Sequence, residues 1–388
     1  MGKRQCPARL ITSPIRRAPL NHIRAGVAIG TALAAALALS SCASNESTPA
    51  SVSSGNPRSS STTALAGTIS GIGSSAQGSA QDAWRQAFQQ ANAGATVNYD
   101  PQGSGAGRTA FMAGGAQFAG SDSFLKPEEL GGTFKACKAG TKAIDLPDYI
   151  SPIALVFNVS GVKSLRLDPA TIAKIFSGKI TKWDDRAIVA LNPGETLPGT
   201  TIDAVHRSDK SGTTNNFTDY LNKTAPSAWP QAAADVFPYR TGDGANGTSG
   251  VVSAVKNGRG TIGYADLSKA QGLPIAKIKV GRTYVMPTAD GAAKVVAASP
   301  IDTGREANDI AVKVNRMTTD PAEYPLTLVS NLIVCQTYAD PSIGSLVKAY
   351  ATYVTGTAGQ QASAKAAGSA PLSGALAETV AKTAATIK

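Results

Sequence analysis

The pattern of apolar and polar positions predicts strands that alternate with helices. Apolar runs of strand length lie near residues 65–69, 96–99 and 117–119, and each is followed by a small polar loop and a helix signal. In the first of these helices Trp84 and Phe88 share one face, since they are four positions apart. This recurrence predicts an α/β fold with its loops gathered beyond the carboxyl ends of parallel strands.

Two longer apolar runs predict crossings between two domains. Residues 150–158 and 324–334 are almost continuously apolar, as is typical of strands buried on both faces. We interpret them as a paired hinge. The first domain then comprises residues 65–150 and 324–388, and the second comprises residues 151–323.

The remaining segments give weaker signals. Residues 304–314 are predicted to form a helix, and the Ala-rich tail from residue 341 to residue 388 should form two or three more. Residues 272–300 contain Lys- and Val-bearing stretches that we expect to be strands and loops, without clear boundaries.

The N-terminal 41 residues have the features of an export signal. A basic stretch without acidic residues precedes an apolar run, residues 25–39, that is too short for a confident membrane span. The sequence Leu-Ser-Ser-Cys that ends at Cys42 resembles the bacterial lipobox, in which the cysteine carries palmitate and becomes the mature N-terminus. An ordinary signal peptide with an unmodified cysteine is the alternative. Residues 42–64, rich in Ser, Thr and Pro, should be a disordered tether.

Charge and cysteine content restrict the class of protein. The net charge is +11, but six of the 37 basic residues lie in the first 41 positions, so the rest of the chain has only a modest positive excess and no basic run. We therefore expect no nucleic-acid partner. Export leaves Cys137 and Cys335 in an oxidising compartment, where a disulfide is expected and two buried thiols are the alternative. Without the signal, His206 is the one remaining histidine, so we expect no metal site.

The segment from Val205 to Thr214 is the strongest candidate site. A short strand near residues 201–205 precedes it, and Phe217 and Tyr220 follow on one face of a predicted helix. The unpaired amides at a helix N-terminus favour a small anion, and a guanidinium such as that of Arg207 holds two oxygens at once. The alternative is an ordinary helix start that Ser211 or Asp209 caps.

Three further loops share this character. Residues 73–75, 103–105 and 120–122 combine glycine and serine at predicted helix starts, and Asp122 adds a carboxylate. Together the four loops predict a cleft that holds one small oxyanion mainly by hydrogen-bond donors.

Here the chain resembles the phosphate-binding protein of bacterial high-affinity phosphate ABC importers. The resemblance extends from about residue 67 to the C-terminus and depends on six motifs: residues 71–75, 102–107, 118–122, 175–185, 191–194 and 206–213. The motifs at residues 175–185 and 206–213 are specific when they occur together. The resemblance implies a two-domain Venus-flytrap fold of the type II periplasmic-binding-protein kind, with two hinge crossover strands and phosphate buried between the domains.

The resemblance also implies the ligand set. Ser75 and the backbone amide of Ala76 bind phosphate from the first loop, Ser104 donates from the second, and Asp122 accepts a proton from the third. In the second domain Arg207 supplies charge with Asp209 as its partner, and three donors come from the helix start: Ser211, Gly212 and Thr213. The chain departs from the family at Ala76, where a larger apolar residue is common.

Chemistry supports this assignment of Asp122. Phosphate keeps a P–OH group near neutral pH and can donate to a carboxylate, whereas sulfate presents only lone pairs. Arsenate has the same protonation pattern and is not excluded. A helix-capping role is the alternative for Asp122.

Other functions are disfavoured by what the chain lacks. Gly71, Gly73 and Ala76 imitate a dinucleotide fingerprint, but an exported protein has little access to a nicotinamide cofactor. A phosphoester hydrolase requires a nucleophile with a base, or paired metals, and the mature chain has one histidine and no carboxylate cluster. We expect no catalytic activity and no cofactor. A phosphate sensor and a receptor for another oxyanion remain alternatives.

The sequence therefore predicts a lipid-anchored phosphate receptor on the outer face of the bacterial cytoplasmic membrane. Its expected partners are inorganic phosphate and the membrane permease subunits of an ABC importer, and it should act as a monomer.

Overall fold

The computed structural model describes residues 65–388, which pack as one unit. The predicted signal segment, the predicted tether and the lipidation candidate Cys42 lie outside the described residues.

A mixed eight-stranded sheet organises this unit, in the order β2-β1-β3-β11-β4-β8-β6-β7. We call the elements around its first five strands the first lobe and those around its last three the second lobe. The strands are β1 (Ala66–Gly73), β2 (Gly94–Asp100), β3 (Phe118–Ser121), β4 (Ala143–Asn158), β6 (Asp203–Arg207), β7 (Gly244–Ala245), β8 (Thr261–Asp266) and β11 (Thr327–Cys335). A second sheet has the order β10-β9-β5, formed by β5 (Arg166–Leu167), β9 (Lys277–Val280) and β10 (Thr283–Val285).

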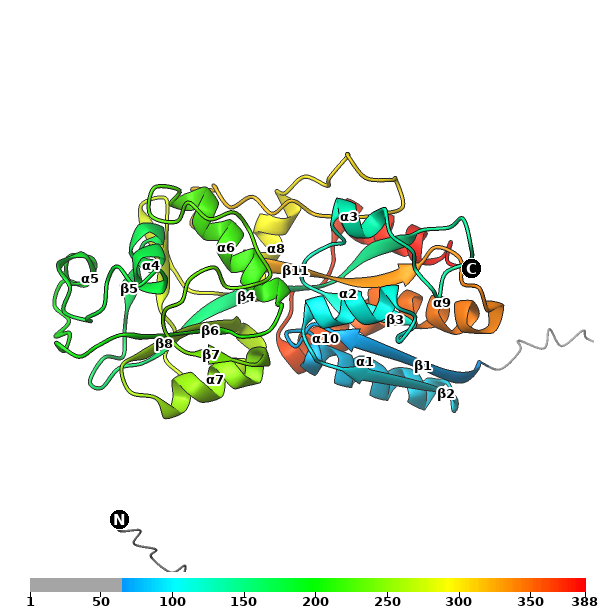
Figure 1. Ribbon diagram of the computed structural model, residues 1–388, viewed down its shortest axis with the longest axis horizontal. Coiled ribbons are helices and arrows are strands. Elements are labelled where there is room, and N and C mark those ends of the chain that lie inside the picture. The colour runs from blue at the N-terminus through cyan, green and yellow to red at the C-terminus, as the bar shows by residue number, and fades with distance from the viewer. Residues whose placement is uncertain (1–64) are drawn as a thin grey trace, which may run out of the picture. The chain divides into compact units, whose positions relative to one another are not determined.

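Strand β4 connects the lobes. It pairs with β11 from Ala143 to Pro152 and with β8 from Ile153 to Asn158, and it extends from the elements around β3 to those around β8 (Figure 1). The chain returns beside this point, where the Ile153 amide donates to the Leu326 carbonyl over 2.8 Å. Fifteen of the strand's sixteen residues are buried, which explains why residues 150–158 are almost continuously apolar. The two predicted crossings therefore lie side by side.

Helices cover both lobes. The first lobe contains α1 (Gly78–Ala91), α2 (Ser104–Met112), α3 (Pro127–Leu130), α9 (Pro341–Thr355), α10 (Thr357–Ala367) and α11 (Gly374–Ala384). The second contains α4 (Pro169–Phe176), α5 (Arg186–Leu191), α6 (Gly212–Thr224) and α7 (Gly247–Asn257), and α8 (Ala289–Ala297) packs against β4. A 3₁₀ turn, η1 (Leu267–Lys269), follows β8.

Local sequence explains where several helices begin. Helices α3, α4 and α9 have proline at the first helical position, which tolerates a missing N–H. Asp168 and Asp340 cap α4 and α9 by accepting from Thr171 and Ser342 amides at 2.7 and 2.8 Å. On α1 the predicted apolar face is present, because Trp84 and Phe88 are both buried.

Two expectations for secondary structure need correction. Residues 304–314 form a loop and not a helix, because Arg305 contacts the side chains of both Asp145 and Asp309, the Asp145 amide donates to Asp309 Oδ1 at 2.8 Å, and the Ile310 amide donates to the Asp145 carbonyl at 2.9 Å. The stretch 272–300 holds helix α8 as well as strands. The tail forms three helices, within the expected range.

Candidate functional site

Strand order brings the three predicted loops of the first lobe together. Strand β1 lies between β2 and β3 and is parallel to both, so the three strands end at one edge of the sheet. Ser75, Ser104 and Asp122 follow these three carboxyl ends. The Ser104 hydroxyl accepts from the Asp122 backbone amide at 3.1 Å, which joins the second loop to the third.

Asp122 is the centre of this edge. Its side chain is 4% exposed, and its Oδ1 accepts from the hydroxyls of Ser74 and Ser330, the latter at 2.7 Å. Its Oδ2 accepts from Thr213 Oγ1 at 2.9 Å. Because every one of these partners is a hydroxyl, the carboxylate is held by donors without a paired cation.

The N-terminus of α6 meets Asp122 from the second lobe. Ser211 caps this helix by accepting from the Thr214 amide at 3.2 Å. A Cβ on Gly212 would lie 2.7 Å from both Asp122 Cβ and Ser104 Oγ, so this close approach requires glycine. The predicted residues Ser104, Asp122, Gly212 and Thr213 are thus in one place.

Arg207 and Asp209 form the charged part of the site. Arg207, at the end of β6, is 3% exposed and donates from Nε to Asp209 Oδ1 at 2.7 Å and from Nη2 to Asp209 Oδ2. Burial opposes ionisation of Asp209, but hydrogen bonds and charge from Arg207 outweigh it and hold the pKa of Asp209 below its usual range. The pair therefore brings hydrogen-bond donors to the site with little net charge.

The first loop contacts the start of α7, which was not among the predicted site segments. Ser75 Oγ lies 2.9 Å from Thr248 Oγ1 and accepts from the Thr248 amide at 3.0 Å. The neighbouring Gly247 amide donates to Asp209 Oδ1 at 3.0 Å. The predicted amide donor, Ala76, is fully buried, and its N–H donates to Ser74 Oγ at 3.1 Å.

Several residues at the site were not among the predicted ligands. Ser74 lies inside the first motif and Thr248 lies in a glycine-rich helix start, so both carried the signal that marked the other loops. Ser330 interrupts a long apolar run, and a hydroxyl within a buried strand is a usable indication of a polar partner. Asn216, on α6, donates to the Asp122 carbonyl at 2.7 Å and had no distinctive signal.

A buried polar network lies behind Asp122. The Gln77 side-chain amide donates to Ser330 Oγ at 2.7 Å and to Asp148 Oδ1 at 2.8 Å. Burial, together with the negative charge of Asp122, raises the pKa of Asp148 well above its ordinary value. Both causes favour the protonated, neutral form of Asp148 behind the site.

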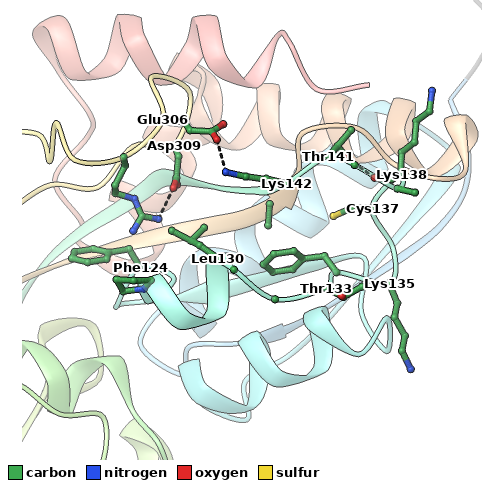
Figure 2. A pocket seen from close by; sticks show the side chains of 18 of the residues that line it. Phe124, Leu130, Thr133, Lys135, Cys137, Lys138, Thr141, Lys142, Glu306 and Asp309 are labelled. Atoms are coloured by element: carbon green, nitrogen blue, oxygen red, sulfur yellow. Dashed lines mark hydrogen bonds and ion pairs between the residues drawn. The ribbon is translucent and has the colours of Figure 1, made fainter.

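A pocket of about 850 Å³ lies elsewhere, on the first lobe (Figure 2). Phe124, Leu130 and Phe134 give it an apolar wall, and ion pairs of Lys142 with Glu306 and of Arg305 with Asp309 line it. None of the predicted phosphate-binding residues lines this pocket.

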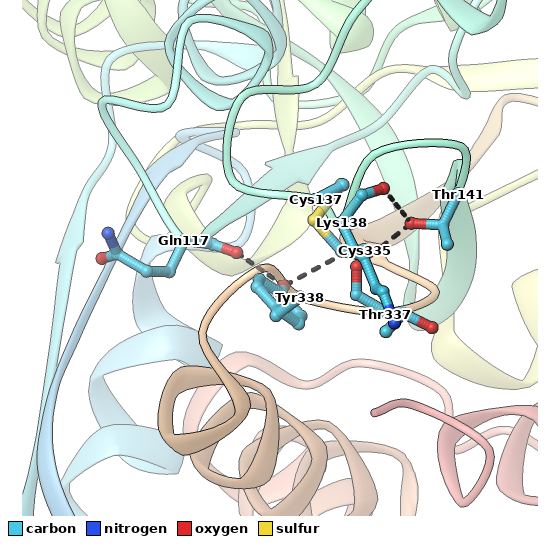
Figure 3. The surroundings of a disulfide bond; sticks show 7 residues. All are labelled: Gln117, Cys137, Lys138, Thr141, Cys335, Thr337 and Tyr338. Carbon is cyan, nitrogen blue, oxygen red and sulfur yellow. Dashed lines mark hydrogen bonds between the residues drawn. A yellow bond between two sulfur atoms is a disulfide. The ribbon is translucent and has the colours of Figure 1, made fainter.

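Cys137, at the edge of that pocket, is joined to Cys335 by a disulfide (Figure 3). Tyr338 supports this region, since its hydroxyl donates to the Gln117 carbonyl at 2.7 Å. Over residues 65–388 no group of three His, Cys, Asp or Glu side chains could hold a metal ion. None of the described helices has both the length and the apolar character needed to cross a membrane.

Fold and site together define a two-lobed α/β binding protein, with donors from both lobes around a single carboxylate. Residues 58–358 match the family model described as PBP superfamily domain. Mycobacterium tuberculosis phosphate-binding proteins PstS 3 and PstS 2 are 39% and 38% identical over 263 residues, which cover 66% of this chain and 70% of each relative. Phosphate-binding protein PstS of Xylella fastidiosa is 34% identical over 251 residues, 63% of this chain and 65% of the relative.

Solved structures agree with the sequence relatives. A high affinity periplasmic phosphate-binding protein (PfluDING) bound with phosphate has a TM-score of 0.67 at 25% identity, covering 81% of this chain and 93% of that one. A phosphate-binding protein from Stenotrophomonas maltophilia has a TM-score of 0.61 at 21% identity, covering 81% and 93%, and shows the fold alone. The chain therefore belongs to the PBP superfamily and, within it, to the PstS family of phosphate-binding proteins. Its two-domain, hinged α/β fold is the one predicted.

Proposed function

We propose that this chain is an extracytoplasmic receptor that binds inorganic phosphate between its lobes and delivers it to an ABC importer. Kinship with the PstS proteins supports the ligand and the transport role. The observation that carries the proposal is the meeting of Asp122 with the N-terminus of α6 at the Thr213 hydroxyl. A buried carboxylate facing a cluster of donors matches an anion that carries one proton.

The two oxygens of Asp122 then have different roles. Oδ1 is held by Ser74 and Ser330 of the first lobe, whereas Oδ2 accepts from Thr213 of the second. On binding, the P–OH group takes the place of the Thr213 hydroxyl on Oδ2, and Thr213 turns its donor to a phosphate oxygen. Sulfate has no proton to offer Oδ2, and the resulting lone-pair contact would be strongly unfavourable in a buried site.

The other proposed ligands complete the shell around the anion. Arg207 supplies charge-assisted hydrogen bonds, and its pairing with Asp209 fixes the orientation of the guanidinium. The remaining donors are hydroxyls and helix-start amides, which favour an anion through their dipoles: Ser75, Ala76, Ser104, Ser211, Gly212 and Thr213. Ala76 joins them once its amide exchanges the Ser74 oxygen for a phosphate oxygen.

Export and anchoring belong to the same proposal. The chain is exported by its first 41 residues, is lipidated at Cys42 with palmitate, and is held outside the bacterial cytoplasmic membrane, where permease subunits receive its phosphate. It acts as a monomer, without nucleic acid and without catalysis. The PstS family consists of binding proteins, which supports the last point.

Calorimetry on residues 61–388 tests the proposal, after unfolding and dialysis to remove any phosphate that copurifies. We expect one-to-one phosphate binding and no response to sulfate. Asp122→Asn should weaken phosphate binding by about tenfold to a hundredfold, because an amide donor then faces the P–OH, and it should bind sulfate measurably.

Asp290→Asn is the matched control, since Asp290 pairs with Lys294 on the exposed side of α8 and the change in charge is the same. It should leave both titrations unchanged. A folded chain that binds neither anion would contradict the proposal, as would equal phosphate affinity of the unaltered chain and Asp122→Asn.

A further inference from the structure

The loop between α6 and β7 carries an acidic residue from the second lobe to the first. Two aromatic residues hold this loop on its own lobe. Trp229 packs against Phe217, and Phe237 stacks on His206. Between them Asp235, only 5% exposed, extends its carboxylate to the first lobe. There it pairs with Arg108 Nη2 at 2.5 Å and accepts from Ser123 Oγ at 3.2 Å.

The guanidinium of Arg108 is held in position by other residues of the first lobe. Arg108 lies on α2, is 3% exposed, and is fixed by Glu129 at 2.9 Å and by the hydroxyls of Ser121 and Ser123 at 3.1 and 2.8 Å. All three fixing partners belong to the first lobe, so the guanidinium is oriented before the lobes meet. Separation of the lobes would break the charge-assisted hydrogen bond between Asp235 and Arg108, which favours the state in which the lobes meet.

The backbone of Asp235 contacts the phosphate motif. Its carbonyl accepts from the Ser211 amide at 2.8 Å, and Ser211 is the N-cap of α6. One residue therefore links the contact between lobes to the position of the helix start that faces Asp122. Its side chain is not a proposed ligand, so its contribution is separable from binding of the anion itself.

We propose that Asp235 and Arg108 form a latch between the lobes that slows release of the bound anion by stabilising the closed state. The proposal rests on the phosphate site argued above and names positioning residues for it. A bond that forms only on closure stabilises the closed complex, so its loss speeds dissociation more than it slows association. Selectivity between phosphate and sulfate is set at Asp122 and is independent of the latch.

The test measures phosphate release and association rates by stopped flow on residues 61–388, comparing the unaltered chain with Asp235→Asn. We expect release at least about tenfold faster, association within about threefold, and unchanged rejection of sulfate. Asp290→Asn, with the same change of charge in an exposed pair, should release phosphate at the original rate.

A double-mutant comparison of release rates shows whether Asp235 acts through Arg108, as a latch requires, or only supports the fold. In an Arg108→Met background Asp235→Asn should accelerate release less than it does in the unaltered chain, because its pair with Arg108 is already broken and Lys126, at 3.4 Å and 42% exposed, is the weaker partner. Asp235→Glu should restore part of the slow release. If Asp235→Asn does not fold, Ser123→Ala replaces it, since Ser123 donates to the same carboxylate, and a smaller acceleration of the same kind is expected.

The outcomes separate the two proposals. A folded Asp235→Asn with an unchanged release rate, or effects of Arg108→Met and Asp235→Asn that simply add, overturns the latch while phosphate binding stands. Faster release together with gained sulfate binding also overturns it, because the ligand shell itself would then have changed. Absence of phosphate binding by the unaltered chain overturns the proposed function and the latch with it.

Discussion

The Thr213 hydroxyl donates to Asp122 Oδ2 at 2.9 Å and so joins the N-terminus of α6 to the end of β3. The other carboxylate oxygen is occupied by Ser74 and Ser330, both of the first lobe. The oxygen that joins the two lobes in this structure is therefore the one that, in the proposed function, exchanges Thr213 for the P–OH group of the ligand. Affinity then depends on how closely the helix start can approach Asp122.

Gly212→Ala tests this dependence. The added methyl group would lie 2.7 Å from Asp122 Cβ and from Ser104 Oγ, so the lobes cannot close without a shift of the backbone. Because overpacking costs about 1–3 kcal/mol, we expect phosphate affinity to fall by about tenfold to a hundredfold in calorimetry. The free energy of unfolding should change less, since the clash exists only in the closed state.

Gly78→Ala is the control for that substitution. Gly78 is likewise the first residue of a helix, and a Cβ there would have open space around it. It should leave phosphate affinity unchanged. Equal affinity of Gly212→Ala and the unaltered chain would show that the helix start does not approach the anion closely.

How much of the site was predictable follows from where its residues lie in the sequence. Asp122, Ser104 and Thr213 each follow a strand or begin a helix, and such positions have a local signature of small polar residues. Ser330 and Asn216 lie within a strand and within a helix, where sequence pattern reports burial but not the partner. Their roles depend on β11 and α6 reaching the same carboxylate, which local sequence does not encode.

The fold was predictable to a similar degree. Strands β4 and β11 were recognised as crossings because burial on both faces makes long parts of their sequences apolar. Helix α8 was missed because its two adjacent valines favour a strand, although its alanines favour a helix. The opposite error occurred at residues 304–314, where Arg305 and Asp309 have the spacing of helical neighbours but form an ion pair within a loop.

Asp209→Asn should weaken stability in a pH-dependent way. The folded pKa of Asp209 is lowered, so its contribution is complete above the unfolded value of 3.8 and is lost as pH falls through the lower folded value. At about pH 7 we expect the variant to have a free energy of unfolding lower by roughly 1–3 kcal/mol, through loss of charge-assisted bonds to Arg207.

Urea unfolding at about pH 7 and about pH 3 would check this expectation. The difference between Asp209→Asn and the unaltered chain should shrink at the lower pH, because the carboxylate is then becoming protonated in both folded and unfolded chains. A difference that stays constant over this range would mean that Asp209 contributes through packing and not through its charge.

The disulfide between Cys137 and Cys335 should stabilise the first lobe. It closes a loop across a sequence separation of 198 residues. Cys137→Ala with Cys335→Ala should lower the free energy of unfolding by roughly 2–5 kcal/mol, because the unfolded chain gains conformational freedom. Cys137 lines a pocket that none of the proposed ligands lines, so we expect phosphate affinity to be unchanged. Denaturant unfolding with and without a reductant measures the first effect, and an unaltered chain insensitive to the reductant would contradict it.

Asp145 gives the opposite pH dependence to Asp209. It is fully buried on β4, where burial and then the charge of Asp309 raise its pKa from 3.8 to about 8, although Arg305 opposes the shift. Between these two values the folded chain keeps a proton that the unfolded chain releases, so stability falls as pH rises through this range. Asp145→Asn keeps the shape of the side chain and removes this titration.

We therefore expect the free energy of unfolding of Asp145→Asn, relative to that of the unaltered chain, to increase as the pH rises from about 5 to about 8.5. The expected increase is about 1–3 kcal/mol. Unfolding free energies of both chains at the two pH values measure this gain, and groups common to both chains cancel in the comparison. Asp290→Asn, on the exposed side of α8, should follow the unaltered chain throughout. A stability difference that decreases with pH would mean that Arg305 dominates Asp145 and keeps it ionised, since an ion pair would then be lost on substitution.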